Sequence, residues 1–102
     1  MMKRGEIWFV ELGLAEKPRP VLILSVDYMD NERAIVTYVP RTTSVRGTRF
    51  EITHADRRFK PGAFDAQGIG TVPTSKLTRH LATLDQETLS IVEDAVRLWL
   101  GL

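Results

Sequence analysis

The hydrophobic positions in the first half of the chain form short stretches that are typical of β-strands. Residues 20–26 (PVLILSV) form an apolar run, which predicts a central strand buried on both faces. Residues 6–12 (EIWFVEL) alternate imperfectly, as in a strand whose two faces are both partly covered. Pro20 can only begin a strand, and Pro40 is expected to end one. The predicted strands are 6–12, 20–26, 34–39 and 48–53, with shorter strands at 69–72 and 80–84.

The C-terminal segment has the periodicity of an amphipathic helix. Its apolar residues recur on one face, at Leu89, Val92, Val96 and Trp99. Asp85 stands at the N-cap position, where its carboxylate can accept from free backbone N–H groups. Gly101 is expected to end the helix. We expect Trp99 to belong to the core or to an interface.

The order of the elements predicts the fold. A polar connection over 57–67 and one helical turn over 75–79 are expected between the strands. Several short strands followed by one helix predict a mainly β protein with α structure, a small and strongly bent antiparallel barrel carrying a C-terminal helix. A length of 102 residues and a mass of 11.6 kDa suit one domain spanning residues 1–102.

Composition excludes several classes of protein. The chain has no cysteine, so disulfides, thiolate nucleophiles and Cys-ligated zinc are ruled out. No apolar run reaches about 18 residues, so no membrane span is expected. The N-terminal sequence MMKRGEIWFVEL turns acidic before any long apolar stretch, so we expect no signal peptide and a cytoplasmic location.

The net charge of +1 hides an uneven distribution of charged residues. Residues 1–80 contain thirteen Lys and Arg against nine Asp and Glu, whereas residues 81–102 contain one against four. The basic excess is greatest over residues 41–60. Such a patch could bind phosphates, although a solvated loop with scattered arginines is the more ordinary interpretation.

Familiar catalytic motifs are missing. The sequence has no GxGxxG, GxxxxGK[ST], HExxH or GxSxG pattern. An acid–base pair of His54 and His80 is possible, but each alone is more typical of a surface residue at a strand edge. Without cysteine or paired histidines, we expect no metal site and no cofactor.

Arginine and hydroxyl side chains gather at predicted strand ends. Pro20 forces Arg19 into an extended conformation, so its guanidinium should emerge at the mouth of the barrel. Thr42, Thr43 and Ser44 follow another strand, and hydroxyl and guanidinium groups can both bind phosphate. Both segments can therefore meet in one pocket. The same pattern also fits an ordinary turn and a surface ion pair.

Four motifs in order carry a resemblance to a known family. They are KRGEIW at 3–8, RPVLILS at 19–25, VPRTTS at 39–44 with RG and FEI after it, and the ending from 77 to 102. Together they resemble the MazF/PemK family of toxin endoribonucleases from bacterial toxin–antitoxin modules. The sequence departs from the family pattern in two places. The loop at 13–18 is shorter, and the basic residue expected within 66–70 is missing.

The resemblance implies an SH3-like or plasmid-toxin barrel that acts as a homodimer. It also implies metal-independent cleavage of single-stranded RNA, through attack of a 2′-hydroxyl that leaves a 2′,3′-cyclic phosphate. It places the active-site pair on Arg19 and Thr42, with the neighbouring Thr43 as the alternative threonine and Glu16 as an acid–base candidate. The side chains expected to bind RNA are Thr43, Ser44, Arg41, Arg46, Arg49 and Gln67.

The chemistry assigned to Arg19 follows from its charge. A guanidinium fixed beside the phosphorane would stabilise the negative charge that develops there. Arg19 stays protonated and cannot shuttle protons.

An acidic, partly disordered antitoxin is expected to occupy the same groove. A gyrase-poisoning toxin without catalysis, and a barrel that only binds RNA, remain alternatives.

Overall fold

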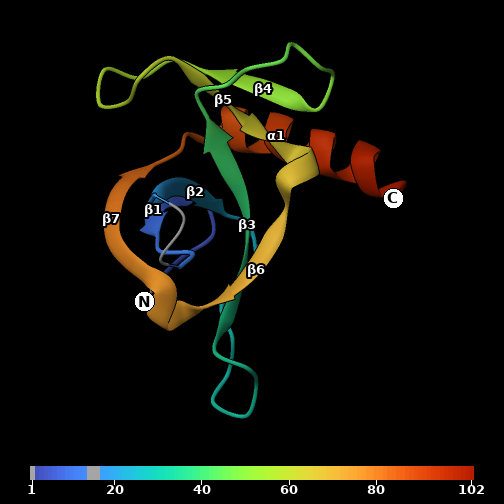
Figure 1. The fold of residues 1–102 in the computed structure, drawn as a ribbon. Coiled ribbons are helices and arrows are strands. Elements are labelled where there is room, and N and C mark those ends of the chain that lie inside the picture. The colour runs from blue at the N-terminus through green and yellow to red at the C-terminus, as the bar shows by residue number, and fades with distance from the viewer. Residues whose placement is uncertain (1, 14–16) are drawn as a thin grey trace.

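The computed structural model describes residues 2–13 and 17–102. In this part of the chain, seven strands, two short 3-10 helices and one α-helix follow one another (Figure 1). The strands are β1 (Glu6–Val10), β2 (Arg19–Ile23), β3 (Ile35–Thr42), β4 (Glu51–His54), β5 (Gly62–Asp65), β6 (Gly70–Pro73) and β7 (Leu77–Thr83). The helices are η1 (Ala66–Gly68), η2 (Thr74–Lys76) and α1 (Gln86–Leu100).

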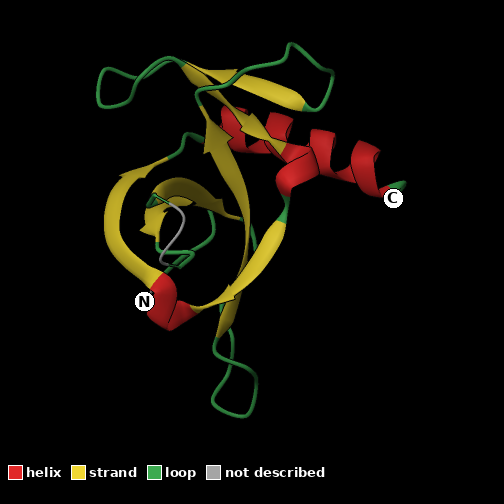
Figure 2. Ribbon diagram, viewed as in Figure 1, coloured by secondary structure: helices red, strands yellow, loops and turns green. Residues whose placement is uncertain are grey.

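All strand pairs in the described residues are antiparallel, in the order β4-β5-β3-β2-β1-β7, and β6 pairs with β3. The sheet bends strongly, so that β1, β2, β3, β6 and β7 curve around one another, while α1 lies beside the β4–β5 hairpin (Figure 2). The predicted mainly β fold, a strongly bent antiparallel barrel with a C-terminal helix, is confirmed, except that the barrel does not close. No pairing between described residues joins β7 to β4, so the sheet is open.

The bend creates two apolar clusters, and β2 contributes to both. Leu22 packs with Val39 and Phe64 in the cluster that α1 covers. Val21 and Ile23 point the other way, into the cluster enclosed by the curved strands. Because successive side chains of a strand point to opposite faces, a strand between two cores must be apolar throughout. The apolar run of this strand thus reflects burial on both faces.

Helix α1 begins and ends as predicted. The Asp85 carboxylate accepts a hydrogen bond from the backbone N–H of Thr88 at 3.0 Å, which caps the first turn. Gly101 adopts a φ of 73°, the left-handed conformation that favours glycine at a helix end. The buried face consists of Leu89, Val92, Ala95 and Val96. No described helix combines the length and the apolar character needed to cross a membrane.

Pro40 does not end the third strand, and this prediction was wrong. β3 continues through Pro40 to Thr42. Its pairing with β6 ends at Tyr38 and its pairing with β5 begins at Arg41, so Pro40 has a neighbouring strand on the β2 side only. A proline is tolerated at such an edge position, since its missing N–H is not needed there.

The segment predicted as a polar connection over 57–67 contains a strand. β5 runs from Gly62 to Asp65 and buries Ala63 and Phe64. Gly62 is required here, because a Cβ at this position would lie 2.4 Å from the backbone oxygen of Thr42. The helical turn expected over 75–79 is shorter than predicted, and η2 ends at Lys76. Strand β7 follows at once from Leu77.

Candidate functional site

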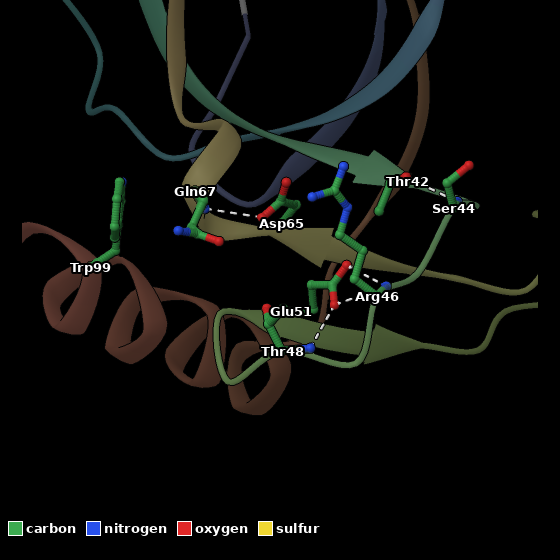
Figure 3. Close-up of a pocket in the computed structure, with 8 residues that line it drawn as sticks. All are labelled: Thr42, Ser44, Arg46, Thr48, Glu51, Asp65, Gln67 and Trp99. Carbon is green, nitrogen blue, oxygen red and sulfur yellow. Dashed lines mark hydrogen bonds between the residues drawn. The ribbon is translucent and has the colours of Figure 1, made fainter.

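A polar cavity of about 420 Å³ lies among the ends of β3, β4 and β5 and the last turn of α1 (Figure 3). It is lined by Thr42, Ser44, Arg46, Thr48, Glu51, Asp65, Gln67 and Trp99. The structure thus brings four predicted site residues together, namely Thr42, Ser44, Arg46 and Gln67. The other four, Thr48, Glu51, Asp65 and Trp99, were not predicted to lie at the site.

The loop that carries Arg46 is fixed by Glu51. The backbone N–H of Arg46 donates to the two Glu51 carboxylate oxygens at 3.1 and 3.0 Å, and that of Thr48 donates at 2.8 Å. These N–H groups hold the pKa of Glu51 below its ordinary value. Gly47, at a φ of 77°, allows the chain to turn between them. The Arg46 side chain is therefore presented from an ordered turn.

Thr42 is held at the end of β3 and faces the cavity. Its hydroxyl oxygen accepts a hydrogen bond from the backbone N–H of Ser44 at 3.0 Å, which leaves the hydroxyl proton available for a ligand. Ser44 lines the cavity next to it. Thr43 is exposed and does not line the cavity. The geometry therefore favours Thr42 over Thr43 as the threonine of the site.

The opposite end of the cavity is formed by η1 and α1. The Asp65 carboxylate accepts from the backbone N–H of Gln67 at 3.1 Å and so caps η1. Trp99 remains 43% exposed and meets Phe50 edge to face, at 5.3 Å between ring centroids. The Arg49 guanidinium lies 4.7 Å from the Phe50 ring, outside the residues that line the cavity. Arg49, predicted to bind RNA, therefore stands beside the cavity.

Arg19 begins β2 and is exposed. β2 pairs with β3 in the register Val21↔Pro40, and continuing that register places Arg19 opposite Thr42. Arg19 and Thr42 thus occupy the same end of two adjacent strands, although Arg19 does not line the cavity. Glu16, the candidate acid or base, lies outside the described residues.

Arg41 is buried, contrary to its predicted role on the surface. Arg41 is only 5% exposed, because its guanidinium passes Gly62 of β5 and reaches His54 at the end of β4. Its Nε donates to His54 Nδ1 at 2.9 Å and its Nη2 donates to the His54 backbone oxygen at 2.8 Å. The guanidinium also lies 5.0 Å from the Phe59 ring. These contacts give Arg41 a structural role and speak against a contact with RNA.

The two histidines lie in different surroundings. His54 is 9% exposed, so the expectation of a surface position at a strand edge was wrong. His80 is exposed, as expected, and its ring stacks on Trp8 with 5.4 Å between ring centroids. Between the residues that the structure describes, no hydrogen bond or ring contact joins His54 to His80, so they form no acid–base pair. Within the described chain, no three His, Cys, Asp or Glu side chains are grouped to hold a metal ion.

The pKa of His54 is lowered by its burial and further by the charge of Arg41. Because His54 Nδ1 accepts from Arg41, the histidine is neutral and carries its proton on Nε2. Protonation would break this hydrogen bond and place two positive charges side by side.

We expect the free energy of unfolding to decrease as the pH falls below about 6.5, the ordinary pKa of histidine. Below that pH the unfolded chain binds a proton at His54 that the folded chain still excludes, and this favours unfolding until the lowered folded pKa is reached. Urea unfolding at about pH 7.5 and about pH 5.5 measures the difference. In the His54→Gln variant, the difference in the free energy of unfolding between the two pH values should become smaller. An unchanged difference would contradict the conclusion that His54 is neutral in the folded protein.

Comparisons with known proteins agree on one family. The family model described as "PemK-like, MazF-like toxin of type II toxin-antitoxin system" matches residues 3–100. A "Probable endoribonuclease MazF" from Mycolicibacterium smegmatis is 32% identical over 108 residues, covering 99% of this chain and 98% of that protein.

Solved structures share the fold along nearly the whole chain. The Mycobacterium tuberculosis toxin MazF-mt6 is 27% identical with a TM-score of 0.80, covering 95% of this chain and 97% of that one. An endoribonuclease in complex with its cognate antitoxin, from a mycobacterial species, is 24% identical with a TM-score of 0.86. That match covers 100% of this chain and 97% of the other.

Proposed function

The chain belongs to the PemK-like, MazF-like toxins of type II toxin–antitoxin systems, and on that premise we propose that it is an endoribonuclease that cleaves single-stranded mRNA in the cytoplasm. The observation that carries the proposal is the 32% identity, over 99% of the chain, to a probable endoribonuclease. Two features support it. The Thr42 and Ser44 hydroxyls and the Arg46 guanidinium line one cavity, and Arg19 begins the strand that pairs with the strand carrying Thr42. We propose that residues 1–102 act as one toxin domain.

The proposed reaction is an internal transfer at phosphorus that needs no metal ion. The 2′-hydroxyl attacks the adjacent phosphorus, the bond to the 5′-oxygen breaks, and a 2′,3′-cyclic phosphate and a 5′-hydroxyl result. The Arg19 guanidinium stabilises the negative charge that gathers on the phosphorane oxygens. The Thr42 hydroxyl orients the phosphate or the attacking hydroxyl. Glu16 is the candidate base that accepts the proton of the 2′-hydroxyl. That proton, or one from water, then goes to the leaving 5′-oxygen and completes the 5′-hydroxyl.

The experiment that tests the activity is cleavage of mixed RNA by purified protein in excess EDTA, with every new 5′ end mapped by sequencing. We expect cuts at a short recurring sequence. Intact RNA together with salt-sensitive RNA binding would indicate a barrel that only binds RNA. Intact RNA without binding would favour a toxin that acts on a protein.

We propose that the active form is a homodimer. The C-terminal helix leaves apolar side chains exposed, with Ile91 at 46% and Leu98 at 52%. A two-fold interface beside the strand that carries Thr42 would cover such a surface and extend the groove across both subunits. Light scattering at micromolar concentration should give twice the mass of the chain. A monomeric mass with full activity would contradict the dimer.

We propose that an acidic, partly disordered antitoxin covers the same cavity. Arg46 lines it and Arg49 stands beside it, and guanidinium groups bind carboxylates as well as phosphates. The double variant Arg46→Ala with Arg49→Ala should lose affinity for the antitoxin by about tenfold at low salt, and less at high salt. The matched control is Arg33→Ala, an exposed arginine in another loop. Unchanged affinity at low salt would contradict the electrostatic part of the proposal.

A further inference from the structure

We propose that the cavity between Thr42 and Trp99 is a nucleobase site that selects guanine. The inference rests on the proposed action on RNA and adds to it the base that the site reads. Figure 3 shows the cavity as two distinct ends, with Thr42 and Ser44 at one and Trp99 at the other. Asp65 and Gln67 lie between these ends, and Arg46 extends into the cavity from the loop below them.

The charges that line the cavity argue against a phosphate in its interior. Two carboxylates, Glu51 and Asp65, face the space that Arg46 enters. A carboxylate repels a phosphate oxygen, but it accepts hydrogen bonds from the N–H groups of a base. The backbone phosphate of a bound strand therefore belongs at the Thr42 end, on the side of Arg19. The base attached to it would then reach into the interior.

Asp65 is the carboxylate that remains able to accept from a base. Both oxygens of Glu51 already accept from the backbone N–H groups of the 46–48 loop. One oxygen of Asp65 caps Gln67, whereas its Oδ2 has no hydrogen-bond partner in the part of the chain that the structure describes. A ligand that offers N–H groups would thus pair with Asp65 without breaking the cavity wall.

Guanine fits this acceptor better than the other three bases. Its Watson–Crick edge offers two adjacent donors, N1–H and the N2 amine. Asp65 can accept from both, through its free Oδ2 and through the second lone pair of the oxygen that caps Gln67. Adenine and cytosine place a ring acceptor beside their amine, and uracil places two carbonyls around a single N–H. Each of them would set an acceptor against the carboxylate. The guanine O6 would accept from the amide of Gln67 or from Arg46, which line the same space.

Trp99 provides the surface on which the base would stack. Its indole is 43% exposed at the end of the cavity, and the edge-to-face contact with Phe50 holds the ring in place. Single-stranded RNA is commonly read by aromatic stacking combined with hydrogen bonds to the edge of the unstacked base. This cavity offers both features, an aromatic ring for stacking and a carboxylate that can accept hydrogen bonds.

The test measures binding without cleavage. Fluorescence anisotropy follows labelled oligouridylates that carry one central guanine, inosine, adenine or cytosine, all with 2′-fluoro groups that remove the attacking hydroxyl. Inosine lacks only the N2 amine, so the wild-type protein should bind it about fivefold more weakly than guanine. Equal binding of guanine and inosine would overturn the proposal, and this comparison requires no protein variant.

Protein variants then locate the contact. Asp65→Asn keeps an oxygen that can cap η1, and it should abolish the preference for guanine over inosine. The control is Asp30→Asn, which should leave the preference unchanged. Asp30 is exposed in the loop that joins β2 to β3, and this loop projects from the end of the molecule opposite to β4, β5 and α1 (Figure 1). Trp99→Ala should lower the affinity for all four oligonucleotides by about tenfold, whereas Trp99→Phe should keep most of the affinity. A preference that survives in Asp65→Asn would overturn the assignment.

The outcomes separate this inference from the proposed function. A protein that prefers guanine but leaves RNA uncut would refute the endoribonuclease and keep the base site. A protein that cuts RNA but binds guanine and inosine equally would refute the base site and keep the endoribonuclease.

Discussion

Replacing Arg19 with alanine should lower the rate of RNA cleavage by about 10²–10³-fold, the loss typical of removing one donor that stabilises a transition state. The side chain is exposed at the start of β2, so the fold should remain intact. Arg19→Lys should recover part of the rate, because an ammonium keeps the charge but loses the planar fork of donors. Single-turnover cleavage of a labelled oligonucleotide measures the effect, after circular dichroism has confirmed folding.

Two threonine variants calibrate this result. Thr42→Ala should lower the cleavage rate by about tenfold to a hundredfold, since the Thr42 hydroxyl only orients the reacting groups. Thr43→Ala should cost less, because Thr43 is exposed outside the cavity. A folded Arg19→Ala variant that cleaves at the wild-type rate would show that the phosphorane is stabilised elsewhere. The arginines at 57 and 58, together with Gln67, would then be examined first.

Replacing Arg41 with alanine should lower the free energy of unfolding by about 3 kcal/mol. The change leaves two buried acceptors of His54, the ring Nδ1 and the backbone oxygen, without their donors. It also removes the contact of the guanidinium with the Phe59 ring. For a domain of this size the melting temperature should fall by about 15 °C. Urea unfolding monitored by circular dichroism measures the change.

Two further variants serve as controls. One keeps the positive charge at position 41, and the other removes an arginine that is exposed. Arg41→Lys should be intermediate, because one ammonium cannot replace the two nitrogens that reach His54. Arg33→Ala removes an exposed arginine and should leave the stability nearly unchanged. If Arg41→Ala proved as stable as Arg33→Ala, the buried position of Arg41 would be wrong and a contact with RNA would again be possible.

Local patterns predicted most of the fold because their signals lie within single elements. The periodicity of α1, its cap at Asp85 and its end at Gly101 are all readable from neighbouring residues. The strand through Pro40 was not predictable, since its tolerance depends on β5 and β6 leaving a gap beside it. β5 is only four residues long, and the burial of Ala63 and Phe64 comes from distant strands.

The candidate site divides in the same way. Thr42 and Ser44 were predicted because their hydroxyls were expected just after a strand, and the family resemblance pointed to the same segment. In the structure Thr42 is the last residue of β3. Glu51 and Asp65 carry no local signal, and only the pairing of β4 with β5 brings them to one cavity. Arg41 was misplaced because the charge of an arginine predicts exposure, whereas its position in β3 turns it toward His54. Burial of a charged side chain depends on partners that lie far away in sequence.

The central claim, metal-independent cleavage through a 2′-hydroxyl, is tested most directly by a pair of oligonucleotides that differ in one atom. Both contain a mapped cleavage site, and one lacks the single 2′-hydroxyl on the 5′ side of the scissile phosphate. In excess EDTA, the complete RNA should be cut to a 2′,3′-cyclic phosphate, and the deoxy substrate should remain intact at that site. Cleavage of both substrates, or cleavage only after a divalent metal ion is added, would contradict the account.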